Sequence, residues 1–192
     1  MINLARLSLL LAIALTAFPL SGCGGRGGTA PLIDIEGYEQ ALARFPGSLV
    51  AVDEGVARFQ STFEDLTAPD VGPRFQQTYA ETFFFNDTLH TIENRAALVD
   101  YMARTGAGLA ESEVIVHQVI RDQADVYVRW TMEFKTEAAG RDIHSQSIGM
   151  THLRFNERGQ VVLHQDFWDS GHALYAHLPF VGFAVKRARS SM

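Results

Sequence analysis

Two apolar runs separated by a short turn constrain this chain more than any other feature. Ile148 to Phe155 and Val161 to Trp168 flank Asn156-Glu157-Arg158-Gly159, and a glycine in so short a connection is typical of a hairpin loop. The second run carries Asp166 among apolar neighbours, where a carboxylate needs a partner or a function. We therefore expect an antiparallel strand pair, with a role for Asp166 that depends on which sheet face it occupies.

The N-terminus has the pattern of a targeting segment. Arg6 supplies its only charge, and the apolar run Leu7 to Leu20 is short for a membrane span. Leu20-Ser21-Gly22-Cys23 is similar to the lipobox of bacterial lipoproteins, whose cysteine is acylated after cleavage before it. This resemblance implies a signal peptide over residues 1–22 and membrane attachment through lipidated Cys23. The alternative is an ordinary secretory leader with a chance cysteine.

The residue after the cysteine also bears on location. It is Gly24 and not aspartate. By resemblance to Gram-negative lipoproteins, this implies an exported protein on the periplasmic face of the outer membrane. Gly24 to Pro31 is rich in glycine and would act as a flexible tether.

Composition limits the partners of the chain. A net charge of −6 argues against a nucleic-acid binder, which would carry a basic stripe. Cys23 is the only cysteine, so no intramolecular disulfide is possible. The sequence has no HExxH motif, second cysteine, phosphate loop or dinucleotide fingerprint, so we expect neither a metal nor another cofactor.

The remaining chain divides into a tether and collar over residues 23–48 and a single domain over 49–192. Apolar periodicity predicts helices first and strands afterwards. The helices are expected at Val52 to the residue before Pro69, Asp70 to Ala80, Glu93 to Thr105 and, interrupted at Pro179, Gly171 to Ala188; the strands are expected at Thr82 to Leu89, Glu113 to Arg121, Asp125 to Thr136, His144 to Phe155 and Gln160 to Asp169. This order indicates an α+β fold with helices on one face of a curved sheet.

The element order resembles the SnoaL-like, nuclear-transport-factor-2-like superfamily, together with the FNDT segment before the third helix and HQDFWD on the last strand. The resemblance implies a cone-shaped, curved antiparallel sheet wrapped around three helices, with a ligand cavity at its open end. Members include isomerases, polyketide cyclases, epoxide hydrolases and non-catalytic binding or dimerisation modules, so the fold does not decide the function.

The limonene-type epoxide hydrolases give the nearest catalytic comparison. Asn86, Arg129 and Asp166 match residues of their site motifs. Thr131 stands where those enzymes have an aspartate that protonates the epoxide. The chain therefore lacks the proton donor of that reaction, which argues against epoxide hydrolysis.

Alternation along the strands predicts which side chains share a face. If the resemblance sets the register, the cavity carries Arg129, Thr131, Ile148, Met150, His152, His164, Asp166 and Trp168. The apolar face formed by Val128, Trp130 and Met132 would then lie outside and need a partner subunit, which predicts a homodimer. The opposite register would make that face the core and place Arg129 and Asp166 in solvent.

Three functions follow as hypotheses. The first is a cell-envelope lipoprotein that holds a small hydrophobic molecule, such as a lipid or isoprenoid, with Arg129 and Asp166 as polar anchors. The second is an isomerase, cyclase or hydrolase in which Asp166 acts as general base and Arg129 or His152 polarises the substrate. The third is a non-catalytic interaction module. The expected ligand contacts are Phe84, Asn86, Thr131, Ile148, Met150, His164 and Trp168.

Two of these candidate groups also have structural interpretations. Asp166 and Arg129 would then form a buried ion pair without a ligand. His152 and His164 would be core histidines with satisfied hydrogen bonds.

Overall fold

The structure is a computed structural model that describes residues 35–138, 140–178 and 181–191. The expected signal peptide, Cys23 and the glycine-rich tether lie outside the described residues. Every helix and strand described below lies between residues 35 and 190. In this part of the chain, no helix combines the length and apolarity needed to cross a membrane.

One six-stranded sheet organises the domain, in the order β2-β1-β6-β5-β4-β3. The strands are β1 (Tyr79–Asn86), β2 (Thr91–Asn94), β3 (Glu111–Asp122), β4 (Asp125–Ala138), β5 (Arg141–Phe155) and β6 (Val161–Trp168). Four of the five pairings are antiparallel, whereas β1 and β6 run parallel. The sheet is therefore mixed, a departure from the expected antiparallel one, because the chain returns to β1 only after the β3–β6 meander.

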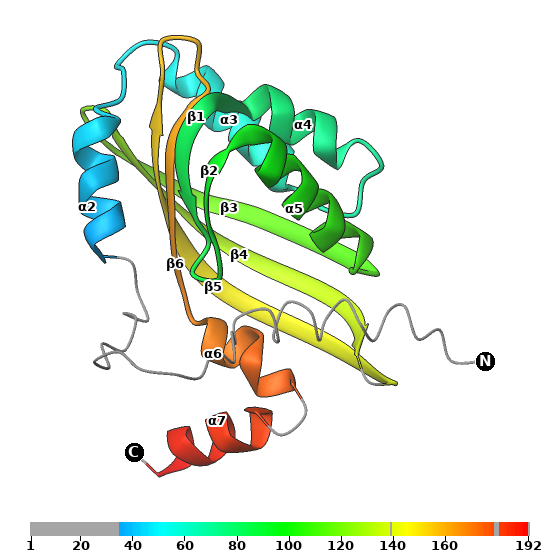
Figure 1. The fold of residues 1–192 in the computed structure, drawn as a ribbon. Coiled ribbons are helices and arrows are strands. Elements are labelled where there is room, and N and C mark those ends of the chain that lie inside the picture. Colours follow the sequence, from blue (N-terminus) through cyan, green and yellow to red (C-terminus); the bar gives the residue numbers. More distant parts are fainter. Residues whose placement is uncertain (1–34, 139, 179–180, 192) are drawn as a thin grey trace, which may run out of the picture.

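Three helices cover the inner face of the curved sheet, as the sequence predicts: α3 (Val52–Phe63), α4 (Val71–Thr78) and α5 (Arg95–Ala107) (Figure 1). Their buried side chains, including Phe59, Phe75 and Leu98, pack with Val128 and Leu153 of the sheet in one core cluster. Burial of this apolar surface is the main favourable term in folding. The α+β, nuclear-transport-factor-2-like architecture is confirmed.

The other sheet face carries α2 (Ile35–Arg44), which packs Ala41 against Phe84 and Leu163. This helix lies within the tether and collar that the sequence analysis places at residues 23–48. Four short segments differ from the prediction: β2 was missed, and the C-terminal helix is divided into α6 (Ser170–Ala173), η1 (Tyr175–His177) and α7 (Val181–Ser190). The three C-terminal segments lie together beyond the end of β6, whereas β2 lies beside β1 (Figure 1).

Strand pairing fixes which residues share the inner face. Asp166 lies opposite Thr151, which lies opposite Val128. Opposed residues in a ladder point to the same side of a sheet. The inner face of β4 is therefore the apolar one that carries Val128 and Trp130, which are 0% and 7% exposed. The expectation that this face lies outside is wrong, because these side chains pack against α3 and α5 as core.

A close approach between two strands supports this register. Gly149 lies opposite Trp130, and a Cβ atom on Gly149 would lie 2.2 Å from Trp130 Cζ2. Only a residue without a side chain leaves room for the indole ring across the sheet. The Trp130 ring is thereby held flat against β5 and forms part of a cavity wall.

Candidate functional site

A cavity of about 680 Å³ opens between the inner sheet face and the helices. Helices α3 and α5, strands β4 to β6 and the C-terminal segment all contribute to its wall. Most of the lining is apolar, and the aromatic residues in it are Phe59, Phe63, Phe85, Tyr101, Trp130, Phe134, Trp168 and Tyr175. Its size and apolar lining are typical of a site for a small organic molecule.

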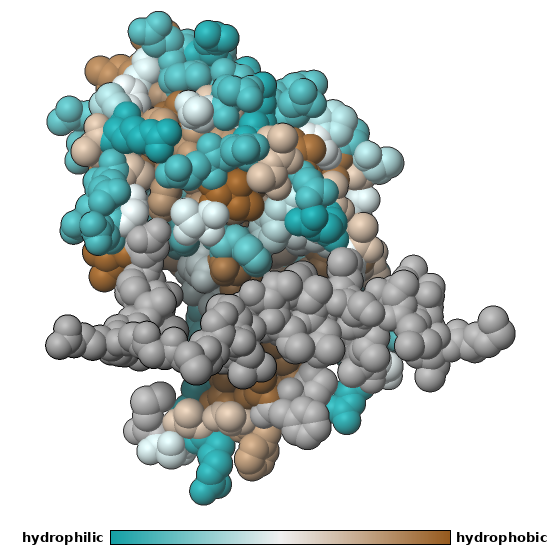
Figure 2. All heavy atoms as spheres, viewed as in Figure 1, coloured by the Kyte–Doolittle hydropathy of each residue, from teal (hydrophilic) through white to brown (hydrophobic). Residues whose placement is uncertain are grey.

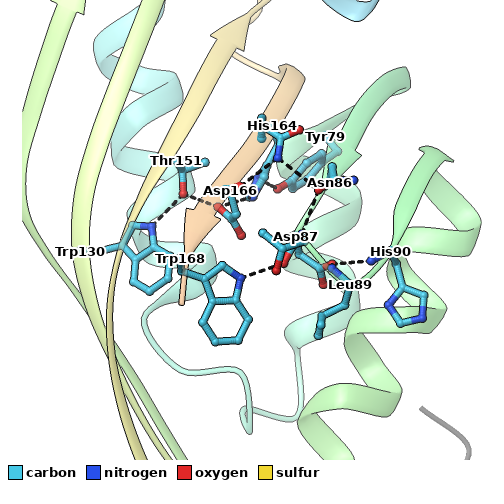
Figure 3. A network of polar contacts seen from close by, with 12 residues as sticks. Tyr79, Asn86, Asp87, Leu89, His90, Trp130, Thr151, His164, Asp166 and Trp168 are labelled. Carbon is cyan, nitrogen blue, oxygen red and sulfur yellow. Dashed lines mark hydrogen bonds and ion pairs between the residues drawn. The ribbon is translucent and has the colours of Figure 1, made fainter. Parts of the chain in front are cut away.

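Asp166 projects from β6 into this cavity and is held by its neighbour on β5. Thr151 Oγ1 donates a hydrogen bond of 2.5 Å to Asp166 Oδ1 and accepts one of 2.8 Å from Trp130 Nε1 (Figure 3). The Asp166 side chain is 13% exposed, so most of it is shielded from solvent. A network of this kind orients a carboxylate before any ligand binds.

His164, two residues before Asp166 on the same face, links it to a buried tyrosine. His164 Nε2 lies 3.0 Å from Asp166 Oδ1, but it makes no aligned hydrogen bond there or elsewhere among the described residues. On the other side of the ring, the Tyr79 hydroxyl and His164 Nδ1 are 2.7 Å apart. Burial, and then the negative charges of Asp166 and Asp87, raise the pKa of Tyr79 well above its ordinary value, so this phenol keeps its proton.

A second carboxyl, Asp87, lines the same cavity. It follows β1, and its Oδ1 accepts hydrogen bonds from the backbone N–H groups of Leu89 and His90, at 2.9 and 2.8 Å. Tyr101 of α5 donates its hydroxyl proton to Asp87 Oδ2 at 2.5 Å. Burial raises the pKa of Asp87, a change to which the charge of Asp166 also contributes and which these three hydrogen bonds oppose.

The two carboxyls therefore share one cavity in different surroundings. In Figure 3 both point toward the space beside the Trp168 ring, whose Nε1 donates to the Asp87 backbone carbonyl at 2.8 Å. Carboxyl pairs whose environments differ in this way divide acid and base roles between them. Among the described residues, no three His, Cys, Asp or Glu side chains gather as a metal site requires.

The predicted site residues separate into two groups. His164, Asp166 and Trp168 lie on the cavity face, and their roles in binding or catalysis stay predictions. The prediction that Arg129, Thr131, Ile148, Met150 and His152 line the cavity is wrong. Arg129 lies opposite Met150, and Thr131 lies opposite Ile148. Each of these residues, like His152, is an odd number of positions along its strand from the row that contains Thr151 and Asp166. Their side chains therefore point to the other face of the sheet, away from the cavity.

Two further predicted contacts lie elsewhere. Phe84 is buried on the outer sheet face against Ala41. Asn86 donates to Thr91 Oγ1 at 2.8 Å and accepts from Gln165 Nε2 at 3.1 Å, and it is absent from the cavity wall. Its neighbours Phe85 and Asp87 face the cavity in its place.

His152 belongs to a separate cluster beneath α2. The Tyr38 hydroxyl lies 2.7 Å from its Nδ1, and Asp125 Oδ1 lies 2.7 Å from its Nε2. Arg154 completes the cluster by donating to Asp125 and to the backbone carbonyls of Leu42 and Phe45 at the end of α2. Burial lowers the pKa of His152 despite the adjacent carboxylate, so the cluster fastens α2 to the sheet with a neutral ring.

Sequence reasoning missed Asp87, Tyr101 and Thr151 as site residues. Asp87 follows Asn86 near the end of a predicted strand, where such residues usually start a turn, and it fills that role through its Asx hydrogen bonds. A polar threonine directly opposite Asp166 across a hairpin was an available signal for Thr151. Tyr101 lies in the predicted helix Glu93 to Thr105, but nothing in its spacing indicates a carboxyl partner.

Known proteins can now be compared with this geometry. Residues 59–164, more than half of the chain, match the model of the SnoaL-like domain. The chain belongs to the SnoaL-like family. The matched residues of this SnoaL-like domain include β1 to β5, α4, α5 and the first half of β6, but they end before Asp166. No curated protein sequence matches the chain.

Solved structures similar to this SnoaL-like domain share its fold at low sequence identity. An LEH-like epoxide hydrolase from M. tuberculosis is 14% identical, with a TM-score of 0.52 over 64% of this chain and 85% of that one. A protein with a ketosteroid isomerase-like fold from Catenulispora acidiphila DSM 44928, in complex with trimethylamine, is 16% identical, with a TM-score of 0.53 over 63% and 89%. An NTF2-like protein from Exiguobacterium sp. 255-15 is 13% identical, with a TM-score of 0.51 over 60% and 98%.

Proposed function

We propose that this protein is an enzyme that transfers a proton within a small, largely apolar molecule bearing a carbonyl group. The observation that carries the proposal is the position of Asp166 and Asp87 in one apolar cavity, with burial raising the pKa of Asp87. The cavity supplies the binding of a hydrophobic molecule that the sequence analysis expected, and the carboxyl pair supplies chemistry.

Asp166 is the general base of the proposed reaction. Its carboxylate accepts the proton from the carbon next to the carbonyl, leaving an enolate. The Thr151 hydroxyl, which donates to Oδ1, orients the carboxylate toward the cavity. The proton then returns from Asp166 to another carbon of the same molecule, so the reaction is an isomerisation that consumes no co-reactant. Proton transfer by a positioned side chain accelerates such steps by about 10²–10⁴-fold.

Asp87 and Tyr101 stabilise the enolate oxygen. Burial raises the pKa of Asp87 and so favours its protonated form. In that form the carboxyl would donate to the Tyr101 oxygen, the reverse of the hydrogen bond in the structure, where Tyr101 donates to Asp87 Oδ2. The Tyr101 hydroxyl proton is then free to bind the substrate oxygen, where negative charge develops. Burial and the nearby carboxyl raise the pKa of Tyr101, which therefore keeps its proton for this bond.

A specific assay tests this function. Cyclic β,γ-unsaturated ketones with increasing numbers of rings are the probes, because their isomerisation gives a conjugated enone that absorbs in the ultraviolet. Asp166→Asn keeps the size of the side chain and removes the base, so the rate should fall by at least about 100-fold. Arg129→Gln is the matched control, since Arg129 is exposed on the opposite face. No conversion of any probe, or equal loss in both variants, contradicts the proposal.

We further propose that the protein is an exported lipoprotein, anchored through acylated Cys23 at the periplasmic face of the outer membrane. The lipobox-like Leu20-Ser21-Gly22-Cys23 and the tether after it support this location. Mass spectrometry of the protein from membranes tests it. A diacylglyceryl mass on Cys23 that is absent from Cys23→Ser is expected, and an unmodified cysteine overturns this proposal.

A homodimer is also proposed, on grounds that differ from those of the sequence analysis. The outer sheet face leaves Ile115, Ile148 and Phe167 exposed at 46%, 70% and 49%. Exposed apolar side chains on one face of a sheet fit a second copy of the chain. Native mass spectrometry should show a dimer that Ile148→Glu converts to a monomer, and it would also detect a bound hydrophobic molecule. A monomeric wild-type protein contradicts the dimer without bearing on the cavity.

A further inference from the structure

The C-terminal helix α7 leaves nearly all of its side chains exposed. Phe183 is 73% exposed and Val181 is 45% exposed, and Gly182 is the one buried residue assigned to the helix among those described. Exposed aromatic side chains are costly in water unless something covers them. Figure 2 shows apolar residues gathered around α6 and α7, whereas the face above them is largely hydrophilic.

The chain after Asp169 carries basic side chains and no acidic ones. None of the 22 acidic residues follows Asp169, whereas Lys186, Arg187 and Arg189 all lie in α7. Arg189 pairs with Asp169 at 2.7 Å, which leaves Lys186 and Arg187 with no ion pair within the described residues. A helix that combines exposed apolar groups with uncompensated cations complements an anionic surface.

A close contact attaches the first turn of the helix to η1. A Cβ atom on Gly182 would lie 2.3 Å from the Ala176 carbonyl oxygen, so only glycine permits this approach. The Gly182 backbone N–H also donates to the Leu178 carbonyl at 2.8 Å. The helix is therefore held at its N-terminal end, and its cations extend beyond the contact.

The same segment forms part of the cavity wall. Tyr175, Leu178 and Val181 all line the cavity. The exposed helix thus begins where the C-terminal segment borders the apolar interior. A surface that binds α7 therefore lies next to the wall of the cavity.

We propose that α7 docks this protein on an anionic lipid surface and brings the cavity to the membrane. The cations Lys186 and Arg187 bind lipid phosphates, and Phe183 inserts among the acyl chains. An apolar molecule then passes between the bilayer and the cavity with little exposure to water. The docking itself does not depend on any reaction in the cavity, so it is tested separately from the proposed enzyme activity.

Vesicle flotation tests the docking. The protein is a chain that starts at Gly24, which retains every described element and lacks the expected acyl anchor. It is mixed with phosphatidylcholine vesicles that either contain or lack phosphatidylglycerol. We expect binding to the anionic vesicles that weakens in high salt. K186Q/R187Q should reduce the partition coefficient by roughly thirty-fold, and Phe183→Ser should reduce it as well.

A matched double variant separates local from overall charge. R121Q/R158Q changes the net charge equally, near the β3–β4 and β5–β6 turns at the other end of the sheet, and should bind as wild type does. Circular dichroism confirms that each variant is folded. Equal binding to neutral vesicles, or equal loss in both double variants, overturns the proposal. Self-association abolished by Phe183→Ser, without vesicle binding, would assign the helix to a second copy and overturns it too.

Discussion

Thr151 Oγ1 donates a 2.5 Å hydrogen bond to Asp166 Oδ1, and the two residues face each other directly across β5 and β6. The backbone ladder therefore holds the carboxylate and its donor in fixed register. Trp130 Nε1 donates a hydrogen bond of 2.8 Å to the oxygen of the same hydroxyl. One threonine thus orients both the proposed base and an indole in the cavity wall.

Replacing this threonine should be costly. Thr151→Val keeps the shape of the side chain but leaves Asp166 and Trp130 without their shared partner in a buried site. The free energy of unfolding in urea should fall by about 1–3 kcal/mol, the usual cost of leaving buried polar groups unsatisfied. Thr131→Val is the control, because the one hydrogen-bond partner of the Thr131 hydroxyl among the residues that the structure describes is exposed His117 on the outer face. Equal stability of the two variants would show that the Thr151 network contributes nothing.

Stability should depend on pH through Asp87. Its pKa is raised in the folded protein, so the folded state binds a proton more tightly than the unfolded state does. Stability is therefore lost as the pH rises from about 4, the ordinary value for aspartate, through the raised pKa. Asp87→Asn lacks this loss. Thermal melts across this range should show that the stability of the variant increases relative to that of the wild type as the pH rises. A constant difference in stability would contradict the assignment of the raised pKa to Asp87.

The cluster beneath α2 should respond to pH in the opposite direction. Burial lowers the pKa of His152, so its contribution to stability is present above about 6.5, the value for a free histidine, and is lost as the pH falls through the lowered pKa. His152→Gln should flatten this part of the profile, measured by thermal melts. His117→Gln, which removes an exposed histidine, should leave it unchanged. A profile that both variants share with wild type would place the titrating group elsewhere.

The packing of Trp130 against Gly149 gives a test of the cavity wall. Gly149→Ala places a Cβ atom 2.2 Å from the indole, which must move or strain the sheet. We expect a loss of about 1–3 kcal/mol in the free energy of unfolding, typical of overpacking. Gly72→Ala is the control, since a Cβ there meets Val99 at an ordinary 3.4 Å. If Gly149→Ala is no less stable than Gly72→Ala, the described fit of Trp130 is incorrect.

The sequence predicts the elements of this fold well because apolar periodicity is local. It places His164, Asp166 and Trp168 correctly on one face of β6. It does not determine how β4 and β5 pair with β6, because that depends on contacts between residues far apart in the chain. Matching Arg129 to an epoxide hydrolase motif shifted the inner face by one residue. The apolar face with Val128 and Trp130 was the better guide, since the core takes the more apolar side.

Other parts of the site could not have been predicted. The Asp87–Tyr101 hydrogen bond joins the end of β1 to the middle of α5, and no spacing or motif connects them. The parallel pairing of β1 with β6 has the same origin. It places Phe85 beside His164 and brings Asp87 into the cavity that Asp166 already faces.

Transfer of deuterium within cyclic β,γ-unsaturated ketones labelled at the carbon between the carbonyl and the double bond tests the central claim most directly. Wild-type protein should convert the labelled ketone to the conjugated enone faster than buffer does and carry part of the label to the γ carbon, and Asp166→Asn should lower the rate by at least about 100-fold while remaining folded. Conversion at the buffer rate, or conversion that survives Asp166→Asn, would show that the cavity does not use Asp166 as a base.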